Sequence, residues 1–293
     1  MKLSDIHIRD PYILPDGGKY YLYGTRGCMY GTETGGARKK AAGFDVYESG
    51  DLAEWSGPRE IFHRPEGFWA DRDFWAPEVH RYGGRYYLFA SFKSETRRRG
   101  TQILVADSPA GPFLPHSDGP VTPAGWECLD GTLYLDGSGA PYLVFSHEWV
   151  QVRDGEMCAL RLSADLKEPA GAPFLLFRAS EPSWALKGGG GFAGYITDGP
   201  FLYRTSEGRL LLLWSSFSAS GYVEAVAWSD SGEITGKWRH CDAPLFPDDG
   251  GHGMVFRAYD GRLLFVMHTP NESPKERPVL KTVFEKGGTL SLG

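Results

Sequence analysis

The chain has 293 residues, of which 41% are hydrophobic and 14% aromatic, and its formal net charge is −6. This length suits one large all-β domain or two smaller domains, and the mildly acidic charge argues against nucleic acid as the main partner. Every apolar stretch is shorter than the roughly 18 residues that a membrane span requires, so we expect no membrane segment.

The N-terminus and the cysteines bear on the cellular compartment. Met1 leads into strand-like sequence without an apolar signal region, which predicts a cytoplasmic protein or a secreted protein whose leader was trimmed. Cys28, Cys128, Cys158 and Cys241 are far apart in the sequence and form no Cys-x-x-Cys pair. This spacing predicts free thiols, not disulfides or a zinc site, and is typical of a reducing compartment.

A hairpin pattern recurs five times along the chain. In one copy, an apolar segment at 198–204 is followed by a Ser-Glu-Gly turn at 206–208 and a second apolar segment at 210–216. The other copies begin at Asp10, Trp75, Asp130 and His252. Such an internal repeat indicates a repeated β unit.

Each hairpin is followed by two further strand signals. In the second unit these are 101–106 and 109–114, and in the fourth unit they are 223–228 and 244–246. Four short strands repeated five times predict an all-β fold, a five-bladed β-propeller that forms one domain over residues 1–293. A two-sheet sandwich would not explain a repeat of about 60 residues with a constant internal layout.

In a propeller, the first strand of every blade lies nearest the axis, so the opening residues should meet at one end of the central channel. The loops after each second strand, at 26–30, 93–99, 147–151, 216–220 and 268–270, should surround the same mouth. The opening residues include Asp10, Asp130 and Asp198. Three nearby carboxyls with divergent pKa values suit acid–base cleavage of an acetal, because one group can give a proton while another activates water. The alternative interpretation is that these aspartates only begin turns, since Asp-Gly and Asp-Pro are common turn formers.

Several other side chains are expected at this mouth. Aromatic rings can stack on the apolar faces of sugars, and Glu148 could bind sugar hydroxyls. The candidate wall residues are Phe74, Trp75, Trp126 and Trp149.

The chain resembles glycoside hydrolase family 43, the five-bladed propeller glycosidases, along nearly its whole length. The motifs that carry the resemblance are Ile8-Arg-Asp-Pro-Tyr-Ile13, Ser49-Gly-Asp-Leu-Ala-Glu-Trp55, Phe74-Trp-Ala-Pro-Glu-Val79, Asp107-Ser-Pro-Ala-Gly-Pro-Phe113, Leu129-Asp-Gly-Thr-Leu-Tyr134, Thr197-Asp-Gly-Pro-Phe-Leu-Tyr203 and Gly251-His-Gly-Met254.

The resemblance implies a role for each carboxyl. Asp10 would be the general base, Asp130 would tune the pKa of the acid and orient the sugar, and Asp198 would be the general acid. Asp198 stands where the family usually has Glu, which shortens the reach of the acid, so Glu148 remains a rival proton donor. The reaction would invert the anomeric centre, with the acid and base carboxyls roughly 6.5–9.5 Å apart.

The resemblance also places His252 on the axis, where it would hold a water molecule or a metal ion, often calcium in this family, through water. No cofactor would be required for the reaction itself.

The expected activity is exo-acting removal of α-L-arabinofuranosyl or β-D-xylosyl units from plant-derived oligosaccharides, and the sequence leaves the oligomeric state open. A non-catalytic carbohydrate-binding propeller is the competing class. A fructosidase-type propeller hydrolase is a further alternative, because Trp126-Glu127-Cys128 resembles the Glu-Cys motif of the invertase relatives.

Overall fold

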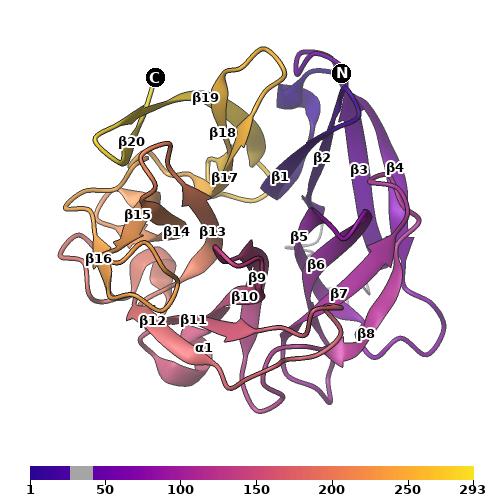
Figure 1. Ribbon diagram of the computed structural model, residues 1–293, viewed down its shortest axis with the longest axis horizontal. Coiled ribbons are helices and arrows are strands. Elements are labelled where there is room, and N and C mark those ends of the chain that lie inside the picture. Colours follow the sequence, from indigo (N-terminus) through magenta and orange to yellow (C-terminus); the bar gives the residue numbers. More distant parts are fainter. Residues whose placement is uncertain (27–41) are drawn as a thin grey trace.

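The computed structural model describes residues 1–26 and 42–293, so positions 27–30 of the first expected mouth loop, including Cys28, lie outside the described residues. Five sheets of four antiparallel strands stand around a central axis like the blades of a wheel (Figure 1). Within each sheet every strand pairs with the next strand in the sequence, so the all-β five-bladed propeller is confirmed.

The strands of the first three blades are as follows. Blade 1 holds β1 (Ile8–Asp16), β2 (Lys19–Arg26), β3 (Gly43–Ser49) and β4 (Ser56–His63); blade 2 holds β5 (Arg72–Tyr82), β6 (Arg85–Lys93), β7 (Gly100–Ala106) and β8 (Leu114–Pro120); blade 3 holds β9 (Cys128–Leu135), β10 (Pro141–His147), β11 (Glu156–Arg161) and β12 (Phe174–Arg178).

The remaining elements complete the wheel. Blade 4 holds β13 (Asp198–Arg204), β14 (Leu210–Ser218), β15 (Gly221–Ser229) and β16 (Trp238–His240); blade 5 holds β17 (Gly251–Arg257), β18 (Leu263–Thr269), β19 (Arg277–Lys286) and β20 (Thr289–Leu292); the short helices are η1 (Leu3–Asp5), α1 (Trp149–Val152) and η3 (Gly189–Gly191). Among the described residues, no helix is long and apolar enough to cross a membrane.

Two outer strands were predicted in the wrong place. The fourth strand of blade 2 is β8, not 109–114, and the fourth strand of blade 4 is β16, not 244–246. Of the latter segment, Phe246 alone pairs with blade 4, through an isolated bridge to Glu224 of β15. Outer strands pack on one side only, so their hydrophobic pattern is weak: three of the seven residues of β8 are exposed and only one is buried.

The core lies between the blades and is largely aromatic around blades 1 and 2. Phe44, Phe62 and Phe92 pack there with ring centroids about 6 Å apart. Cys128, Cys158 and Cys241 are free thiols, which confirms the expectation for the three cysteines that the structure describes.

The first strand of every blade contains a β-bulge at the same place. In each blade two residues of the first strand face one residue of the second, and the bulged pairs are Asp10–Pro11, Ala76–Pro77, Asp130–Gly131, Gly199–Pro200 and His252–Gly253. The first residue of each pair has a positive φ between 45° and 56°. A bulge bends its strand and re-aims its side chains, so this repeated feature shapes the inner end of all five blades.

Most of the bulges are hydrogen-bonded to the preceding blade. The bulge amides donate to side chains of the neighbouring second strand in four cases: Ala76 to Oγ1 of Thr25 at 2.7 Å, Asp130 to Oγ of Ser91 at 2.9 Å, His252 to Oγ of Ser215 at 2.7 Å, and Asp10 to Nδ1 of His268 at 3.2 Å. These bonds fix the blades relative to one another at the axis.

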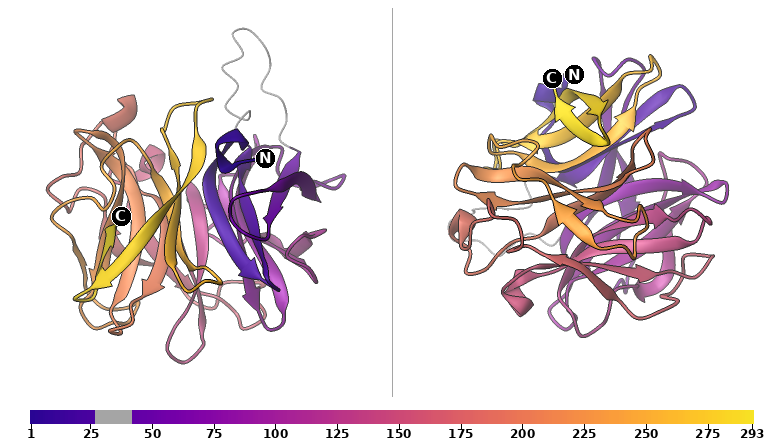
Figure 2. Two further views of the ribbon diagram at one scale, coloured as in Figure 1. Left: turned by 90° about the horizontal axis from the view of Figure 1, so that it is seen from above. Right: turned by 60° about the vertical axis from the view of Figure 1, so that its left-hand side comes forward.

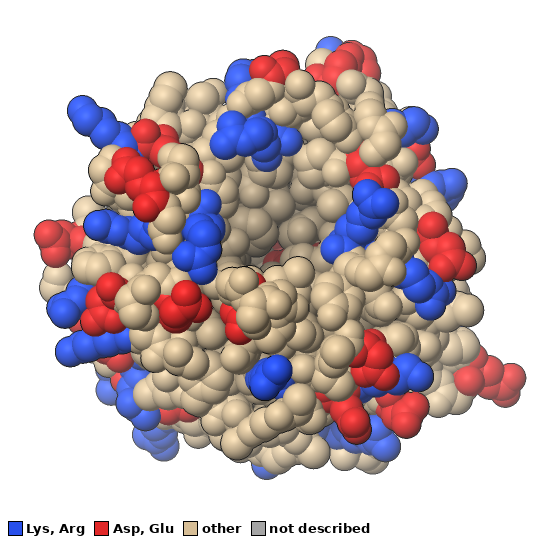
Figure 3. All heavy atoms as spheres, viewed as in Figure 1, with Lys and Arg blue, Asp and Glu red and all other residues tan. Residues whose placement is uncertain are grey.

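The two faces of the wheel differ in what they carry. The first strands begin at one face, which is the upper edge in the left view of Figure 2, and run to the other face. Figure 3 shows that other face, which is hollowed at its centre and carries a mixture of basic and acidic side chains. The pocket described next lies at the opposite end of the axis, where the first strands begin.

Candidate active site

A pocket of about 460 Å³ lies where the first strands begin. The residues that line it include the bulge residues Asp10, Asp130 and His252. They also include residues that immediately precede a bulge, namely Arg9, Trp75, Leu129 and Asp198. The three aspartates from blades 1, 3 and 4 therefore line one cavity. Asp198 is one position out of register with Asp10 and Asp130, because Gly199 occupies the bulge of blade 4.

Asp10 is the most strongly ionised of the three carboxyls. Its Oδ2 accepts a 2.6 Å hydrogen bond from Oγ1 of Thr25, and its Oδ1 lies 3.2 Å from Nδ1 of His252 and 3.6 Å from Nε of Arg9. Burial alone would raise the pKa of Asp10, but the charges of His252 and Arg9 outweigh it and hold the pKa at about 2. A carboxyl that stays ionised can accept a proton from water.

The surroundings of Asp198, in contrast, favour its protonated form. Its Oδ2 accepts a 3.1 Å hydrogen bond from the phenol of Tyr222. Burial, and secondly the charge of Asp130, raise the pKa of Asp198 to about 7. A carboxyl with this pKa keeps its proton in mildly acidic solution, and can deliver it there.

Asp130 lies between these two groups. Its Oδ2 accepts the amide hydrogen of Gly199 at 3.0 Å and lies 3.7 Å from Nδ1 of His252. Burial and the negative charge of Asp10 raise its pKa well above the usual range for an aspartate. Asp130 thus bonds to the backbone beside Asp198 and raises the pKa of Asp198, which suits a tuning and orienting group.

His252 is in contact with carboxylates, and this affects the expected metal site. Its Nδ1 faces both Asp10 and Asp130, and the described residues contain no cluster of three or more His, Cys, Asp or Glu side chains that could hold a metal ion directly. Calcium takes six to eight oxygen ligands, so these side chains do not fit a direct calcium cage. An ion held through water beside His252 stays a prediction.

The family follows from a comparison with known proteins. The family model described as "Glycosyl hydrolases family 43" matches residues 4–285. The chain belongs to glycosyl hydrolase family 43. The sequence resemblance to this family is thereby confirmed.

Solved structures of this family and its fold are similar to the chain. The endo-arabinase from Bacteroides thetaiotaomicron VPI-5482 is 42% identical, with a TM-score of 0.90 over 99% of this chain and 98% of that one. A thermostable family-43 glycoside hydrolase has a TM-score of 0.83 over 98% of this chain and 92% of that one, and at 24% identity it shows the fold alone.

Curated relatives match over shorter segments. An extracellular endo-α-(1→5)-L-arabinanase of Bacillus subtilis (strain 168) is 27% identical over 159 residues, which are 50% of this chain and 45% of the relative. A xylosidase/arabinosidase of Humicola insolens is 24% identical over 50% of this chain and 46% of the relative. These matches span just under half the length of the curated relatives.

Glu148 lines the family 43 pocket, but as a member of an ion pair. Arg99, only 7% exposed, binds the carboxylate of Glu148 through Nη1 and that of Asp73 through Nη2 at 2.8 Å. The Arg99 guanidinium also lies 4.1 Å from the ring centroid of Trp75. This network fixes Glu148 and Trp75 in the pocket wall, and it weakens the case for Glu148 as proton donor, because its carboxylate already accepts a strong bond.

Two expected wall residues lie elsewhere. Phe74 is 1% exposed and packs in the core, with its ring centroid 4.8 Å from that of Phe92. Neighbouring residues of a strand point to opposite sides, so Phe74 faces the core because Trp75 faces the pocket. The prediction that Phe74 binds substrate was wrong.

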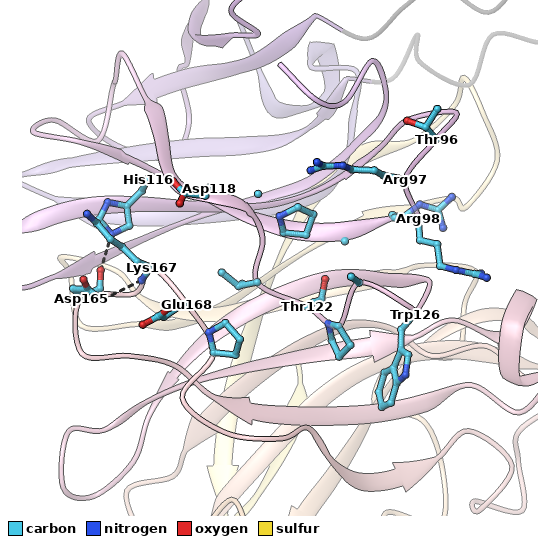
Figure 4. A pocket seen from close by; sticks show the side chains of 18 residues that line it. Thr96, Arg97, Arg98, His116, Asp118, Thr122, Trp126, Asp165, Lys167 and Glu168 are labelled. Carbon is cyan, nitrogen blue, oxygen red and sulfur yellow. Dashed lines mark hydrogen bonds between the residues drawn. The ribbon is translucent and has the colours of Figure 1, made fainter. Parts of the chain in front are cut away.

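Trp126 was also misplaced. It lies at the edge of a separate cavity of about 890 Å³ between blades 2 and 3, and its indole points away from the charged residues there (Figure 4). The ring instead stacks on His147, at 4.1 Å between centroids and an interplanar angle of 10°. Its expected role in the wall of the carboxylate pocket was therefore wrong.

The Glu-Cys motif does not supply a group to the pocket either. The carboxylate of Glu127 accepts bonds from Nζ of Lys93 at 3.0 Å and from the amide of Arg99 at 2.9 Å. Glu127 is not among the pocket-lining residues. The fructosidase-type alternative therefore has no proton donor at this position.

Sequence reasoning missed some residues of the site. Trp149 lines the pocket as expected, but so do Phe192, Phe217, Tyr222 and Asn271, which had not been singled out. Phe217 lies inside the expected mouth loop 216–220, so its position could have been inferred from the hairpin layout. Phe192 follows an irregular glycine-rich segment, which carries no periodic signal.

Proposed function

We propose that the chain hydrolyses α-L-arabinofuranosyl bonds in arabinan-derived oligosaccharides by single displacement with inversion. The observation that carries this proposal is the divergence of two carboxyls in one pocket, with a pKa of about 2 for Asp10 and about 7 for Asp198. Asp10 deprotonates the attacking water, and Asp198 protonates the leaving oxygen of the acetal. Asp130 raises the pKa of Asp198 and positions it through Gly199.

The sugar and the mode of attack are supported by the relatives. The 42% identical Bacteroides protein is named an endo-arabinase, and the Bacillus subtilis relative is named an endo-α-(1→5)-L-arabinanase. We therefore propose internal cleavage of arabinan, which departs from the exo action expected from the sequence. A second candidate is terminal cleavage of xylosyl or arabinosyl units, because the Humicola insolens relative is named a xylosidase/arabinosidase.

Product analysis tests the proposal. Linear α-1,5-arabinan digested with the protein should give a ladder of oligosaccharides early in the reaction, and proton NMR should show the inverted anomer first. Release of arabinose alone would indicate terminal cleavage, and activity on nitrophenyl β-D-xyloside alone would favour the xylosidase candidate. Sugar binding without turnover on either class would support the non-catalytic propeller.

A further inference from the structure

Four aromatic side chains form a continuous strip along one wall of the pocket. We define this aromatic strip as Tyr222, Phe217, Phe192 and Trp149. Successive ring centroids lie 5.2 Å, 5.8 Å and 5.3 Å apart in that order. All four residues line the pocket that holds the carboxyls, so the strip is part of its surface.

The strip leads from the reacting centre to solvent. Tyr222 is 1% exposed and donates its phenolic hydrogen to Asp198, Phe217 is 8% exposed, and Phe192 is 42% exposed. Exposure rises from Tyr222 to Phe192 and is lower again at Trp149, which is partly buried, so a ligand can extend from Asp198 outward to Phe192.

The outer end of the strip is held by close packing of a glycine loop. A Cβ atom at Gly190 would lie 2.6 Å from Cζ of Phe217, and Gly190 has a φ of +65°. Only glycine fits this position without a shift of the loop or the ring. The loop that carries Phe192 is thus packed directly onto Phe217, and the strip is preformed.

The outer part of the strip lies on the side of the acid, whereas its inner end reaches both carboxyls. Tyr222 donates to Asp198 and also stacks on His268, whose Nδ1 lies 3.7 Å from Oδ1 of Asp10. Phe217 lies on β14 and Phe192 in the loop before β13, so both belong with Asp198 to blade 4, whereas Asp10 belongs to blade 1. In an inverting glycosidase the acid protonates the leaving-group oxygen while the base acts from the opposite face of the sugar. A leaving group departing past Asp198 meets the aromatic strip.

We propose that the aromatic strip binds the sugar units on the leaving-group side of the cleaved bond, and that these units are neutral pentosyl residues of an oligosaccharide chain. This inference rests on the proposed function. The apolar C–H faces of sugars stack on aromatic rings, and the strip itself contains no charged side chain that would select a uronic acid. The site therefore favours longer chains over substrates with a small leaving group.

The test is the chain-length dependence of kcat/KM for arabino-oligosaccharides of two to six units. Phe192→Ala should reduce kcat/KM for the longest chains by about tenfold, as expected for loss of one well-packed aromatic contact, and should affect the disaccharide less. Phe192→Trp should restore the chain-length preference. Phe284→Ala is the matched control, because Phe284 is 56% exposed on β19, outside the pocket, and should leave all rates unchanged.

An equal loss at every chain length, or no loss at any, would overturn the inference. Failure of the proposed function would look different, because the wild-type protein would then turn over none of these chains. In that case calorimetric binding of the hexasaccharide decides: a weaker affinity of Phe192→Ala than of Phe284→Ala supports the strip, and equal affinities refute it.

Discussion

Nδ1 of His252 lies 3.2 Å from Oδ1 of Asp10. Both residues occupy bulges with positive φ, in blades 5 and 1, so two distant parts of the chain bring an imidazole onto a carboxylate. The imidazole helps to keep Asp10 ionised, and the pKa of Asp10 is about 2 although the side chain is buried. The resulting difference in pKa between Asp10 and Asp198 underlies the pH dependence expected of the protein.

We expect kcat/KM to decline as the pH rises through about 7. Catalysis requires Asp198 protonated, and its pKa is about 7, so the active fraction decreases tenfold per pH unit above that value. Asp10, with a pKa of about 2, stays ionised over the whole working range. Steady-state rates on an uncharged arabinoside between pH 4 and 9 measure this limb, and a plateau extending to pH 9 would exclude Asp198 as the acid.

The identity of the acid can be tested by substitution. We expect Asp198→Asn to lower kcat by roughly 10²–10⁴-fold on oligosaccharides, and by far less on a dinitrophenyl arabinoside, whose leaving group needs no proton. Glu148→Gln should weaken binding equally for both substrates, since Glu148 is held by Arg99 in the wall. If the rescue by the acidic leaving group appears in Glu148→Gln instead, the two roles are exchanged.

The ion pair of Arg99 with Glu148 should show strong thermodynamic coupling. Arg99→Met leaves the buried carboxylate of Glu148 and the partly buried carboxylate of Asp73 without their cation, and removal of one partner of a buried pair typically costs about 3–5 kcal/mol. The double variant Arg99→Met/Glu148→Gln should recover part of this loss in urea unfolding. Purely additive effects would show that the pair contributes no coupling.

Glu224 should make the protein less stable as the pH rises. This side chain is fully buried and burial raises its pKa to about 8, while Oε2 accepts bonds from Oγ of Ser215 and the amide of Gly253. The unfolded pKa is about 4.3, so the folded state binds the extra proton between these values and its stability declines from about pH 4 to pH 8.

The Glu224→Gln variant has no titratable group at this position and does not lose this stability. We therefore expect its melting temperature to exceed that of the wild type by an amount that grows from pH 5 to pH 8. Glu207→Gln, at an exposed turn, is the control and should follow the wild type at each pH. A constant difference between Glu224→Gln and the wild type across this range would contradict the assignment of a raised pKa.

The repeat made the propeller and two of the three carboxyls predictable. Asp10 and Asp130 open hairpins and both occupy bulges, as the shared position of their hairpins indicates. Asp198 opens its hairpin one residue earlier, because Gly199 takes the bulge. Proline is the second bulge residue in blades 1, 2 and 4, so the position of Pro200 could have indicated this arrangement. Phe74 could have been excluded from the pocket by strand alternation with Trp75.

Loops and outer strands could not be predicted in the same way. The pairing of Arg99 with Glu148 joins loops of two blades and depends on their packing. Trp126 turns onto His147, a contact set by a loop of irregular conformation. The outer strand β8 is polar, so neither alternation nor apolar content marks its place.

Because the bulge is common to all five blades, its first residue has the same backbone conformation in each of them, with a positive φ. Three of them carry reactive groups, one is blocked because a Cβ at Gly199 would lie 2.7 Å from the ring of His252, and the fifth, in blade 2, holds only the methyl group of Ala76. The groups on the axis therefore differ between blades by single side chains on one shared backbone geometry. Ala76 is 2% exposed and is not among the residues that line the pocket, so blade 2 contributes to the pocket through Trp75 and not through its bulge.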